Sequence, residues 1–225
     1  MIEDLLPSPA VTAESFGDIA GVALFPEEEA HVARAVAKRR REFTTVRACA
    51  RQALGELGEA PAPLLPGLRG APGWPPGIVG SMTHCEGYRA SAVARDSELA
   101  AIGLDAEPDG PLPDGVLDLV SDEAERAWIS DLSAKVPEVS WDRLLFSAKE
   151  SVYKAWFPLT CRWLDFAEAT ITVSPGDGTF RARLLVTGRT AEGRKLTGFR
   201  GRWLARDGLV LTAIAVPAGQ DEVTA

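Results

Sequence analysis

The stretch WDRLLFSAKESVYKAWF, residues 141–157, decides the fold of the second half of the chain. Its apolar residues recur at the spacing of an amphipathic helix. They fill one broad side of that helix: Trp141, Leu144, Leu145, Ala148, Val152 and Ala155. The segments that follow, ATITVSP, TFRARLLVT and LTGFRGRWLARDGLVLTAIAV, are typical of β-strands, and Asp207-Gly208 is the strongest hairpin turn in the chain. The second half is therefore predicted to be helices followed by strands.

The first half of the sequence has the same order of elements. Residues 26–58 begin with a proline and acids and end with a glycine, which predicts one or two helices over about 27–57. After a proline-rich loop at 58–77 come two β-prone runs around Glu86-Gly87 and then the strand LAAIGLDAEP. A second breaker-rich stretch, DGPLPDG at 109–115, is the predicted boundary. We therefore expect a mixed α/β (α+β) fold with two similar halves, 1–109 and 110–225, which suggests an internal duplication.

Composition and charge exclude several classes of protein. The chain has 225 residues, enough for one large or two small domains, and a formal net charge of −8, which disfavours binding to nucleic acid. No apolar run approaches the roughly 20 residues that span a bilayer, and the start, MIEDLLPSPA, has acids where a secretory signal is basic. We therefore expect a cytoplasmic protein without a membrane partner. Cys49, Cys85 and Cys161 form no CxxC pair and are predicted to be reduced thiols.

An arginine-rich helix is the first candidate for chemistry. Arg40, Arg47 and Arg51 fall within about 40° of one another on a helical wheel, beside an apolar stripe. The alternative is a solvated helix face neutralised by the glutamates at 27–29, which is the commoner role of a charge run. Arg69 in the proline-rich loop and His84 in the hairpin favour a phosphate site instead, because guanidinium groups bind phosphate through two hydrogen bonds.

The sequence Asp105-Ala106-Glu107 ends an apolar strand and is the second candidate. Side chains alternate along a strand, so the two carboxylates point the same way and repel each other unless a hard cation lies between them. Magnesium is the natural ligand for such a pair. The alternative is a pair of solvated acids where the strand enters a turn, which is the commoner meaning of an isolated motif of this kind.

Glu150 and Lys154, one helical turn apart on the helix quoted above, are the third candidate. They would present a base and a cation to one substrate. The alternative is an exposed i,i+4 pair, worth about 0.2–0.5 kcal/mol. Other chemistries find no support: the chain has no GxxxxGK[ST] and no strand-linked GxGxxG, and its two histidines exclude a multi-histidine zinc centre.

Taken in order, four motifs make the chain similar to the 4′-phosphopantetheinyl transferases, closest to the Sfp and enterobactin-synthase type from actinobacteria. The motifs are KRRREF…VRACAR, GSMTHCEGYRASAV, IGLDAEP and FSAKESVYKAWFPLT, and the resemblance covers about residues 35–215. It implies two pseudo-twofold-related α/β halves, each with helices on a mainly antiparallel sheet and with the active site between them. It also implies a holo-[acyl-carrier-protein] synthase, which transfers the phosphopantetheine arm of coenzyme A to a serine of an apo acyl, peptidyl or aryl carrier protein and releases 3′,5′-ADP.

The resemblance implies a role for each matching residue. Asp105, Glu107 and Glu150 would bind magnesium, and Asp105, Glu150 and Lys154 would be catalytic. The residues implied to bind coenzyme A are Arg39, Arg40, Arg47, Arg69, His84, Lys149 and Lys154. The helical face favours Arg40 for the nucleotide, whereas alignment of the motif favours Arg39. Glu150 would take the serine proton either directly or through a metal-bound water.

Two other classes of function stay open at this point. A coenzyme A-binding module without transferase activity would need the basic residues but not the acids. A pure interaction protein that uses the arginine-rich helix would leave the DAE and KESVYK motifs unexplained. The protein is expected to be a monomer. Carriers of lipid, polyketide, nonribosomal peptide and siderophore pathways all fit the resemblance, because each presents a serine on a small helical protein.

Overall fold

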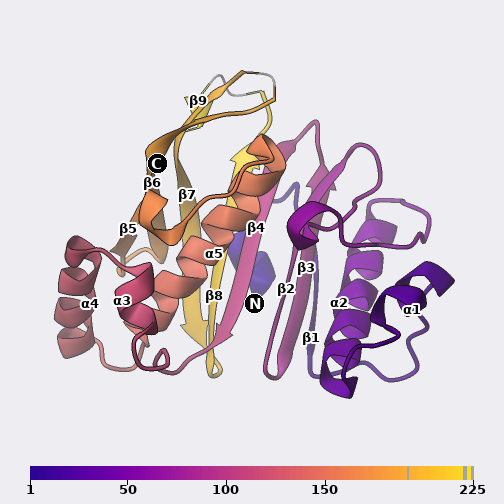
Figure 1. Cartoon of the computed structure of the whole chain (residues 1–225), viewed down its shortest axis with the longest axis horizontal. Helices are drawn as coiled ribbons and strands as arrows, with labels where there is room; N and C mark the ends of the chain where they lie inside the picture. The colour runs from indigo at the N-terminus through magenta and orange to yellow at the C-terminus, as the bar shows by residue number, and fades with distance from the viewer. Residues whose placement is uncertain (192, 220–221, 224–225) are drawn as a thin grey trace.

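The computed structural model describes residues 1–191, 193–219 and 222–223, and it is a mixed α+β structure with two sheets (Figure 1). The first sheet has the strand order β1 (Val11–Phe16), β3 (Tyr88–Arg95), β2 (Ile78–Cys85). The second has the order β4 (Leu99–Pro108), β8 (Leu209–Pro217), β7 (Lys195–Arg206), β6 (Thr179–Arg189), β5 (Ala169–Ser174). These strands pair antiparallel, and the short β9 (Glu222–Val223) pairs parallel with β7. The predicted fold class is confirmed.

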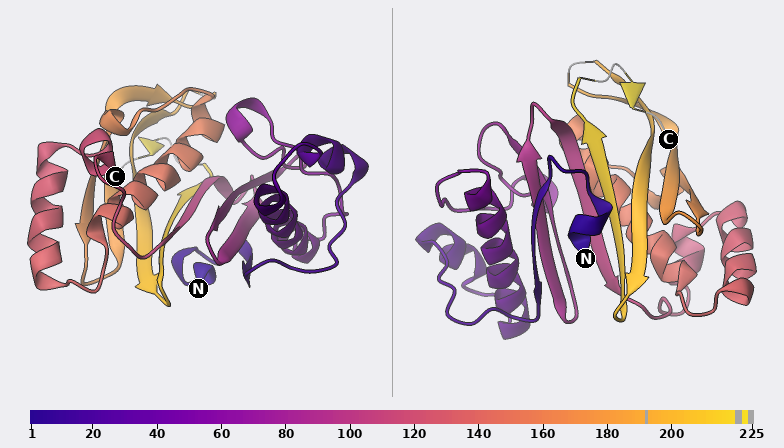
Figure 2. Two further views of the ribbon diagram at one scale, coloured as in Figure 1. Left: turned by 60° about the horizontal axis from the view of Figure 1, so that its bottom comes forward. Right: turned by 180° about the vertical axis from the view of Figure 1, so that it is seen from behind.

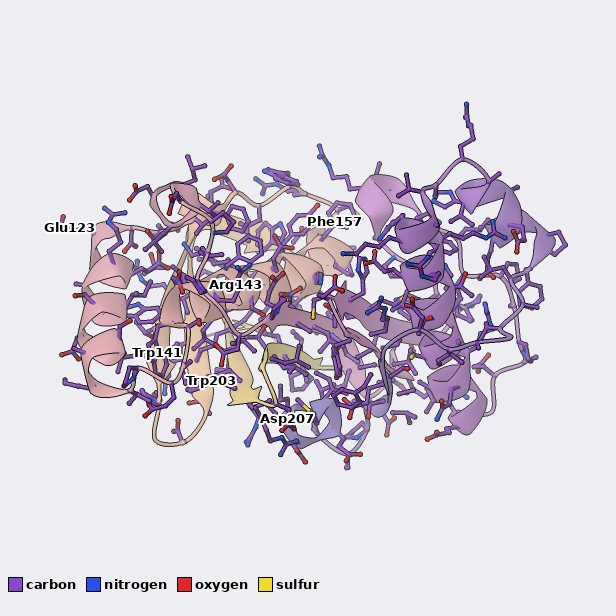
Figure 3. All side chains as sticks on the ribbon, turned by 90° about the horizontal axis from the view of Figure 1, so that it is seen from below. Glu123, Trp141, Arg143, Phe157, Trp203 and Asp207 are labelled. Atoms are coloured by element: carbon purple, nitrogen blue, oxygen red, sulfur yellow. The ribbon has the colours of Figure 1, made fainter. Side chains whose placement is uncertain are left out.

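Each sheet packs against one long helix, and the periodicity predicts both helices. The helices are α1 (Pro26–Val32), α2 (Ala37–Glu56), α3 (Val116–Val120), α4 (Glu123–Lys135) and α5 (Trp141–Thr160), with 3-10 turns η1 (Ile2–Leu5), η2 (Leu68–Gly70) and η3 (Phe166–Glu168). The region 27–57 thus holds two helices, of which α2 packs on the first sheet. Helix α5 lies across the second sheet, and its apolar side forms the main core, where Trp141 meets Trp203 edge to face at 5.3 Å between ring centroids (Figure 3).

Strand β4 belongs to the second sheet, although the boundary predicted from sequence at 109/110 assigns it to the first half. It pairs with β8 from Leu99↔Pro217 to Pro108↔Leu209. Its residues are mostly buried on both faces, as is typical of an inner strand. The partner strand lies far along the chain, so no local pattern reveals the pairing. The sheets therefore divide between β3 and β4, and the two halves as separate units stay a prediction.

The two sheets meet where β2 lies beside β4, and side-chain hydroxyls join them. Ser81 Oγ accepts a hydrogen bond of 3.1 Å from the backbone N–H of Leu104, and Thr83 Oγ1 accepts one of 3.0 Å from that of Ala106. Buried backbone N–H groups need such partners when no neighbouring strand supplies a carbonyl. We call this joint, formed by Ser81 and Thr83 with β4, the hydroxyl seam.

Helix α5 approaches β4 very closely at Gly103. A Cβ atom at this position would lie 2.0 Å from the backbone oxygen of Ser151, so only glycine fits there. Asp105 follows two residues later on the same strand, while Glu150 and Lys154 flank Ser151 on α5. The glycine thus brings the acid of β4 within reach of the charged side chains of α5.

A buried glutamate anchors a short helix in each half. Glu28 of α1 is fully buried, and it accepts hydrogen bonds of 2.9 Å from the Leu64 N–H and from Arg51 of α2. Glu125 of α4 is also fully buried, and it accepts from Lys149 of α5 at 2.8 Å. Both glutamates lie at the third position of their helix. This parallel agrees with the repeated order of elements in the sequence.

Candidate active site

A cavity of about 850 Å³ opens between the two sheets and collects most of the predicted site residues. Its walls come from α2, the loop at 66–74, β2, β4 and α5. A volume of this size suits a ligand as large as a nucleotide. The elements around the first sheet supply arginines and a histidine, and the elements around the second sheet supply Asp105, Glu150 and Lys154. The predicted residues that line the cavity are Arg39, Arg47, Arg69, His84, Asp105, Glu150 and Lys154.

Asp105 and Lys154 form an ion pair in this cavity. Lys154 Nζ donates 2.8 Å to Asp105 Oδ1 and 2.9 Å to the carbonyl oxygen of Leu104. Lys154 therefore does not form the surface pair with Glu150 that is the ordinary meaning of this spacing. The side chain of Glu150 makes no hydrogen bond or ion pair with any residue that the structure describes. Burial, and next the charge of Asp105, raise the pKa of the Glu150 carboxyl.

The acids at this end of the cavity fit a hard cation. Asp105 Oδ2 is buried and has no hydrogen-bond partner among the described residues. Burial and the charge of Asp105 also raise the pKa of Glu107, in spite of Arg143. A cation would relieve this repulsion, and carboxylate oxygens are what Mg²⁺ prefers. However, no group of three or more His, Cys, Asp or Glu side chains in the described part of the chain is arranged to hold a metal.

Arg47 approaches the cavity on a rigid support. Its guanidinium carbon lies 3.2 Å from the ring centroid of Phe43, and its Nε donates 2.9 Å to the carbonyl of Leu64. Burial lowers the pKa of Arg47 to about 10, so this arginine stays charged at neutral pH. The cation is therefore already in place before any ligand binds.

Arg69 reaches the cavity from the proline-rich loop. Its backbone has a positive φ of 52°, and its guanidinium carbon lies 5.1 Å from the ring centroid of Trp163. Trp163 follows α5 and so belongs to the second half of the chain. This contact thus connects the proline-rich loop of the first half to the second half of the chain.

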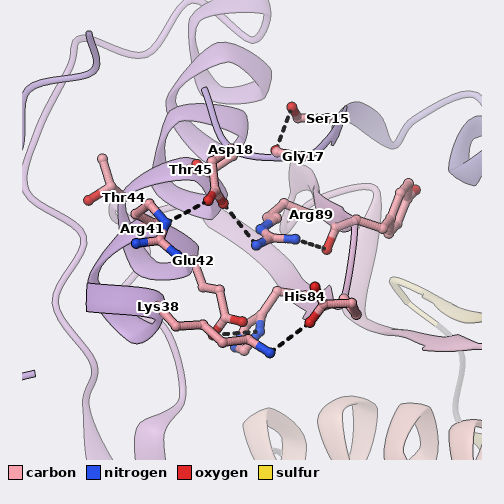
Figure 4. A network of polar contacts seen from close by, with 12 residues as sticks. Ser15, Gly17, Asp18, Lys38, Arg41, Glu42, Thr44, Thr45, His84 and Arg89 are labelled. Carbon is pink, nitrogen blue, oxygen red and sulfur yellow. Dashed lines mark hydrogen bonds and ion pairs between the residues drawn. The ribbon is translucent and has the colours of Figure 1, made fainter. Parts of the chain in front are cut away.

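His84 lies in a chain of polar contacts with α2 (Figure 4). Arg39 Nη1 lies 2.7 Å from His84 Nε2. Because arginine is a donor only, Nε2 accepts and the proton is on Nδ1, 3.6 Å from Glu42 Oε2. Burial and then Arg39 lower the pKa of His84, so the ring is neutral near pH 7. Glu42 is a buried acid that the sequence analysis did not single out, because it follows a run of cations.

The expectation of a neutralised helix face holds for part of the arginine-rich helix. Arg40 pairs with Glu29, and Arg51 pairs with a glutamate of α1 as well. Arg39 and Arg47 form no ion pair with the described residues and line the cavity instead. Of the two arginines that the sequence left as alternatives for the nucleotide, Arg39 is therefore the one that faces the cavity.

Two further predicted site residues do not line this cavity, and each has another partner. Glu107 accepts a hydrogen bond of 3.1 Å from Arg143 Nη1. The ammonium group of Lys149 is buried and donates to Glu125 and to the carbonyl of Phe166. The structure therefore does not support a role for Lys149 in binding coenzyme A, because its charge is already neutralised inside the second half.

Thr83 is a residue of the site that the sequence analysis missed. Its hydroxyl lies 3.4 Å from Asp105 Oδ1, on the same oxygen that Lys154 contacts, and it also accepts from the Ala106 N–H. These contacts leave Oδ2 as the bare oxygen of Asp105. The signal in the sequence would have been alternate hydroxyl residues, Ser81 and Thr83, on a strand that is otherwise largely apolar.

The fold and the site define a two-sheet α+β protein whose cavity joins a cationic wall to a carboxylate–lysine wall. Two family models match this chain: the 4′-phosphopantetheinyl transferase N-terminal domain over residues 27–94, and the 4′-phosphopantetheinyl transferase superfamily over residues 101–203. The chain belongs to the 4′-phosphopantetheinyl transferase superfamily and is a transferase. The resemblance drawn from the four motifs is confirmed, and the family acts on coenzyme A and carrier proteins.

Curated relatives match over nearly the whole chain. The 4′-phosphopantetheinyl transferase Svp of Streptomyces mobaraensis is 62% identical over 100% of this chain and 94% of its own length. Npt of Nocardia iowensis is 50% identical over 96% of this chain and 99% of its own. PptT of Mycobacterium tuberculosis is 52% identical over 91% of each chain. Among the described residues, no helix has the length and apolar character needed to cross a membrane.

Proposed function

We propose that this chain transfers the 4′-phosphopantetheine arm of coenzyme A to a serine of an apo acyl, peptidyl or aryl carrier protein and releases 3′,5′-ADP. The observation that carries the proposal is the cavity that brings a cationic wall opposite Asp105, Glu150 and Lys154. Coenzyme A has a 3′-phosphate on its nucleotide and a pyrophosphate where the transfer occurs. It therefore needs cations at the nucleotide end of the site and reacting groups at the pyrophosphate. We also propose that the chain works in the cytoplasm as a monomer, with neither nucleic acid nor membrane as a partner.

The cationic wall would hold the nucleotide phosphates. Arg39, Arg47 and Arg69 offer guanidinium groups, which match phosphate oxygens and keep their charge. His84 contributes a neutral ring whose Nε2 accepts from Arg39. Because Arg47 is held by its contact with Phe43 in the free protein, little side-chain entropy is lost when a phosphate binds it. This wall thus sets the position of coenzyme A before reaction.

The second wall would carry the chemistry. The serine hydroxyl oxygen attacks the β-phosphorus of coenzyme A, a new P–O bond forms, and the bond from that phosphorus to the oxygen shared with the α-phosphate breaks. Glu150 takes the serine proton, and its carboxylate has no competing donor in the described structure. Lys154 lies beside Asp105, where its ammonium group would stabilise the departing phosphate oxygen.

Magnesium would bind at Asp105, whose buried Oδ2 has no hydrogen-bond partner among the described residues, with Glu150 and Glu107 as the further proposed ligands. When bound, the ion would neutralise the pyrophosphate oxygens during transfer. Asp105 contributes the bare, buried Oδ2, while Thr83 and Lys154 fix its other oxygen. Glu107 would have to share its carboxylate with Arg143, which holds it in the free protein.

The direct test incubates the purified chain with coenzyme A, magnesium and a panel of apo carrier proteins. Mass spectrometry then reports whether a carrier gains one phosphopantetheine group and whether 3′,5′-ADP appears in equal amount. Binding of coenzyme A without turnover of any apo carrier would favour the coenzyme A-binding module instead. Absence of coenzyme A binding would exclude both.

Arg47→Ala is expected to raise the KM for coenzyme A about 10- to 100-fold while changing the KM for dephospho-coenzyme A much less. The reason is the loss of a charge-assisted contact to the 3′-phosphate, worth about 1.5–3 kcal/mol. Steady-state kinetics with both substrates checks this. Equal losses for the two substrates would place Arg47 away from the 3′-phosphate.

Thr83→Val is expected to lower kcat about tenfold, because Asp105 loses one of the two side-chain donors on Oδ1. Ser81→Ala is the matched control, since it removes the other hydroxyl of the seam without touching Asp105. Both variants should lower thermal stability to a similar extent. Thr83→Ser should restore kcat, and a loss of kcat in Ser81→Ala as large as that in Thr83→Val would contradict the role of Thr83.

A further inference from the structure

Four exposed arginines lie on one face of the second sheet, and we call them the arginine patch: Arg181 and Arg183 of β6 and Arg200 and Arg202 of β7. Side chains alternate between the faces of a sheet. The neighbours Phe180, Ala182 and Phe199 are buried in the core with the apolar side of α5. The arginine patch is therefore on the opposite face. From behind, strands of this sheet stand in front of α5 (Figure 2).

The arginine patch has no neutralising partner in the structure. Within residues 1–191, 193–219 and 222–223, none of the four side chains makes a hydrogen bond, ion pair or ring contact. Arg181 lies directly opposite Arg200, and like charges in that position destabilise a sheet. The other cross-strand neighbours are small or hydroxyl residues: Thr172 beside Arg181, Thr170 and Gly198 beside Arg183, and Thr179 and Ala213 beside Arg202.

This lack of partners contrasts with other parts of the surface. The chain has a net charge of −8, and acids pair with surface arginines elsewhere, such as Arg41 with Asp18 and Arg95 with Glu59. A positive cluster on an acidic protein concentrates the attraction for anions at one place. The patch thus has the charge and the exposure of a surface that meets an anionic partner.

We propose that the arginine patch binds a carboxylate-rich surface of the protein that bears the acceptor serine. This inference rests on the proposed function, which makes a protein the second substrate. Guanidinium groups bind carboxylates in pairs of parallel hydrogen bonds. The four arginines are spaced about 5 Å across the strands and about 7 Å along them, which suits a few neighbouring carboxylates.

The charge of the whole chain favours a compact acidic surface over an extended polyanion. A membrane or a nucleic acid would reach beyond the patch and meet the acidic remainder of the protein within a screening length of about 8–10 Å. A short acidic surface of a protein would contact the arginines alone. The partner is therefore an acidic protein surface.

The position of the arginine patch relative to the cavity determines which part of the acceptor protein the patch can contact. Glu150 and Lys154 are on α5, on the other face of the sheet. The surface that binds the arginines is therefore separate from the serine that enters the cavity. Such a second contact raises the effective concentration of the serine near the site without changing the chemistry.

The first test measures binding of a fluorescein-labelled decaglutamate peptide by anisotropy. The wild type is compared with Arg181→Glu/Arg200→Glu and with Arg34→Glu/Lys135→Glu, which reverses two exposed cations elsewhere and changes the net charge equally. The peptide is expected to bind the first variant about tenfold more weakly than it binds the wild type, and to bind the control variant nearly as well as the wild type. Binding should weaken as salt rises. Equal weakening in both variants, or no binding to the wild type, overturns the patch as a site.

The second test uses an apo carrier that the wild type modifies, both as an excised domain and within its full-length protein. Arg181→Glu/Arg200→Glu should raise the KM for the full-length acceptor and leave kcat and the excised domain unchanged. An unchanged KM for the full-length acceptor overturns the assignment of the partner. The assignment is also overturned if the arginine patch binds phosphatidylglycerol vesicles or a short oligonucleotide more tightly than it binds the decaglutamate peptide. Failure of the wild type to modify any excised carrier would instead refute the proposed function.

Discussion

Asp105→Asn is expected to lower kcat about 10²- to 10³-fold while the protein stays folded. The substitution keeps the size of the side chain but removes the charge that faces the cavity, and losses of this order follow when one group that stabilises transition-state charge is removed. Asp105 is the residue on which Lys154, Thr83 and the proposed magnesium site meet. Measurement of kcat at saturating coenzyme A and magnesium checks the prediction.

The control for Asp105→Asn is a binding measurement. Magnesium affinity, measured by calorimetry without an acceptor, should fall in the variant, whereas coenzyme A binding through Arg39 and Arg47 should persist. The contrary result is a variant that keeps more than about a tenth of wild-type kcat and an unchanged magnesium affinity. That loss of kcat is well below the loss expected for a group that stabilises transition-state charge. This result would show that Asp105 serves only the ion pair with Lys154. Thermal unfolding separates this result from loss of the fold.

Glu150→Gln is expected to lower kcat about 10²- to 10⁴-fold, the range of general-base catalysis. The amide keeps the shape of the side chain but cannot take the serine proton. Glu150 hydrogen-bonds to no described donor, so the fold should lose little stability. A steady-state kcat together with a melting curve measures both quantities.

Lys154→Ala supplies the contrasting variant on the same helix. It should lower kcat while coenzyme A still binds, because the contact of Lys154 with the leaving oxygen is strongest in the transition state. It should also lower stability more than Glu150→Gln does, since it leaves Asp105 without its cation. Unchanged turnover in both variants would mean that neither residue takes part in the reaction.

Local patterns predict the helices and so the element that carries each of several candidate residues. The apolar spacing of 141–157 placed Glu150 and Lys154 on α5, and the arginine spacing placed Arg47 on α2. These predictions succeed because helical periodicity depends on neighbours within a few residues. The choice between Arg39 and Arg40 needed the position of a glutamate on a different helix.

Long-range contacts account for what the sequence did not reveal. Lys149 belongs to the motif that carries Glu150, yet its side chain is buried against Glu125 of α4. Glu28 sits in a run of three glutamates that looks solvated, but it is buried and pairs with Arg51. In each case a partner that is distant in the sequence determines whether the charged side chain is buried or exposed. The spacing of residues along the chain does not reveal that partner.

The hydroxyl seam has a consequence for how this enzyme can change over evolutionary time. The arginines and the histidine of the cavity belong to elements around the first sheet, whereas Asp105, Glu150 and Lys154 belong to elements around the second. Strands β2 and β4 meet through two side-chain hydroxyls instead of a shared backbone ladder. Substitutions around one sheet can therefore alter the arginine wall, and substitutions around the other can alter Asp105, Glu150 and Lys154, provided that Ser81 and Thr83 keep the two sheets in register.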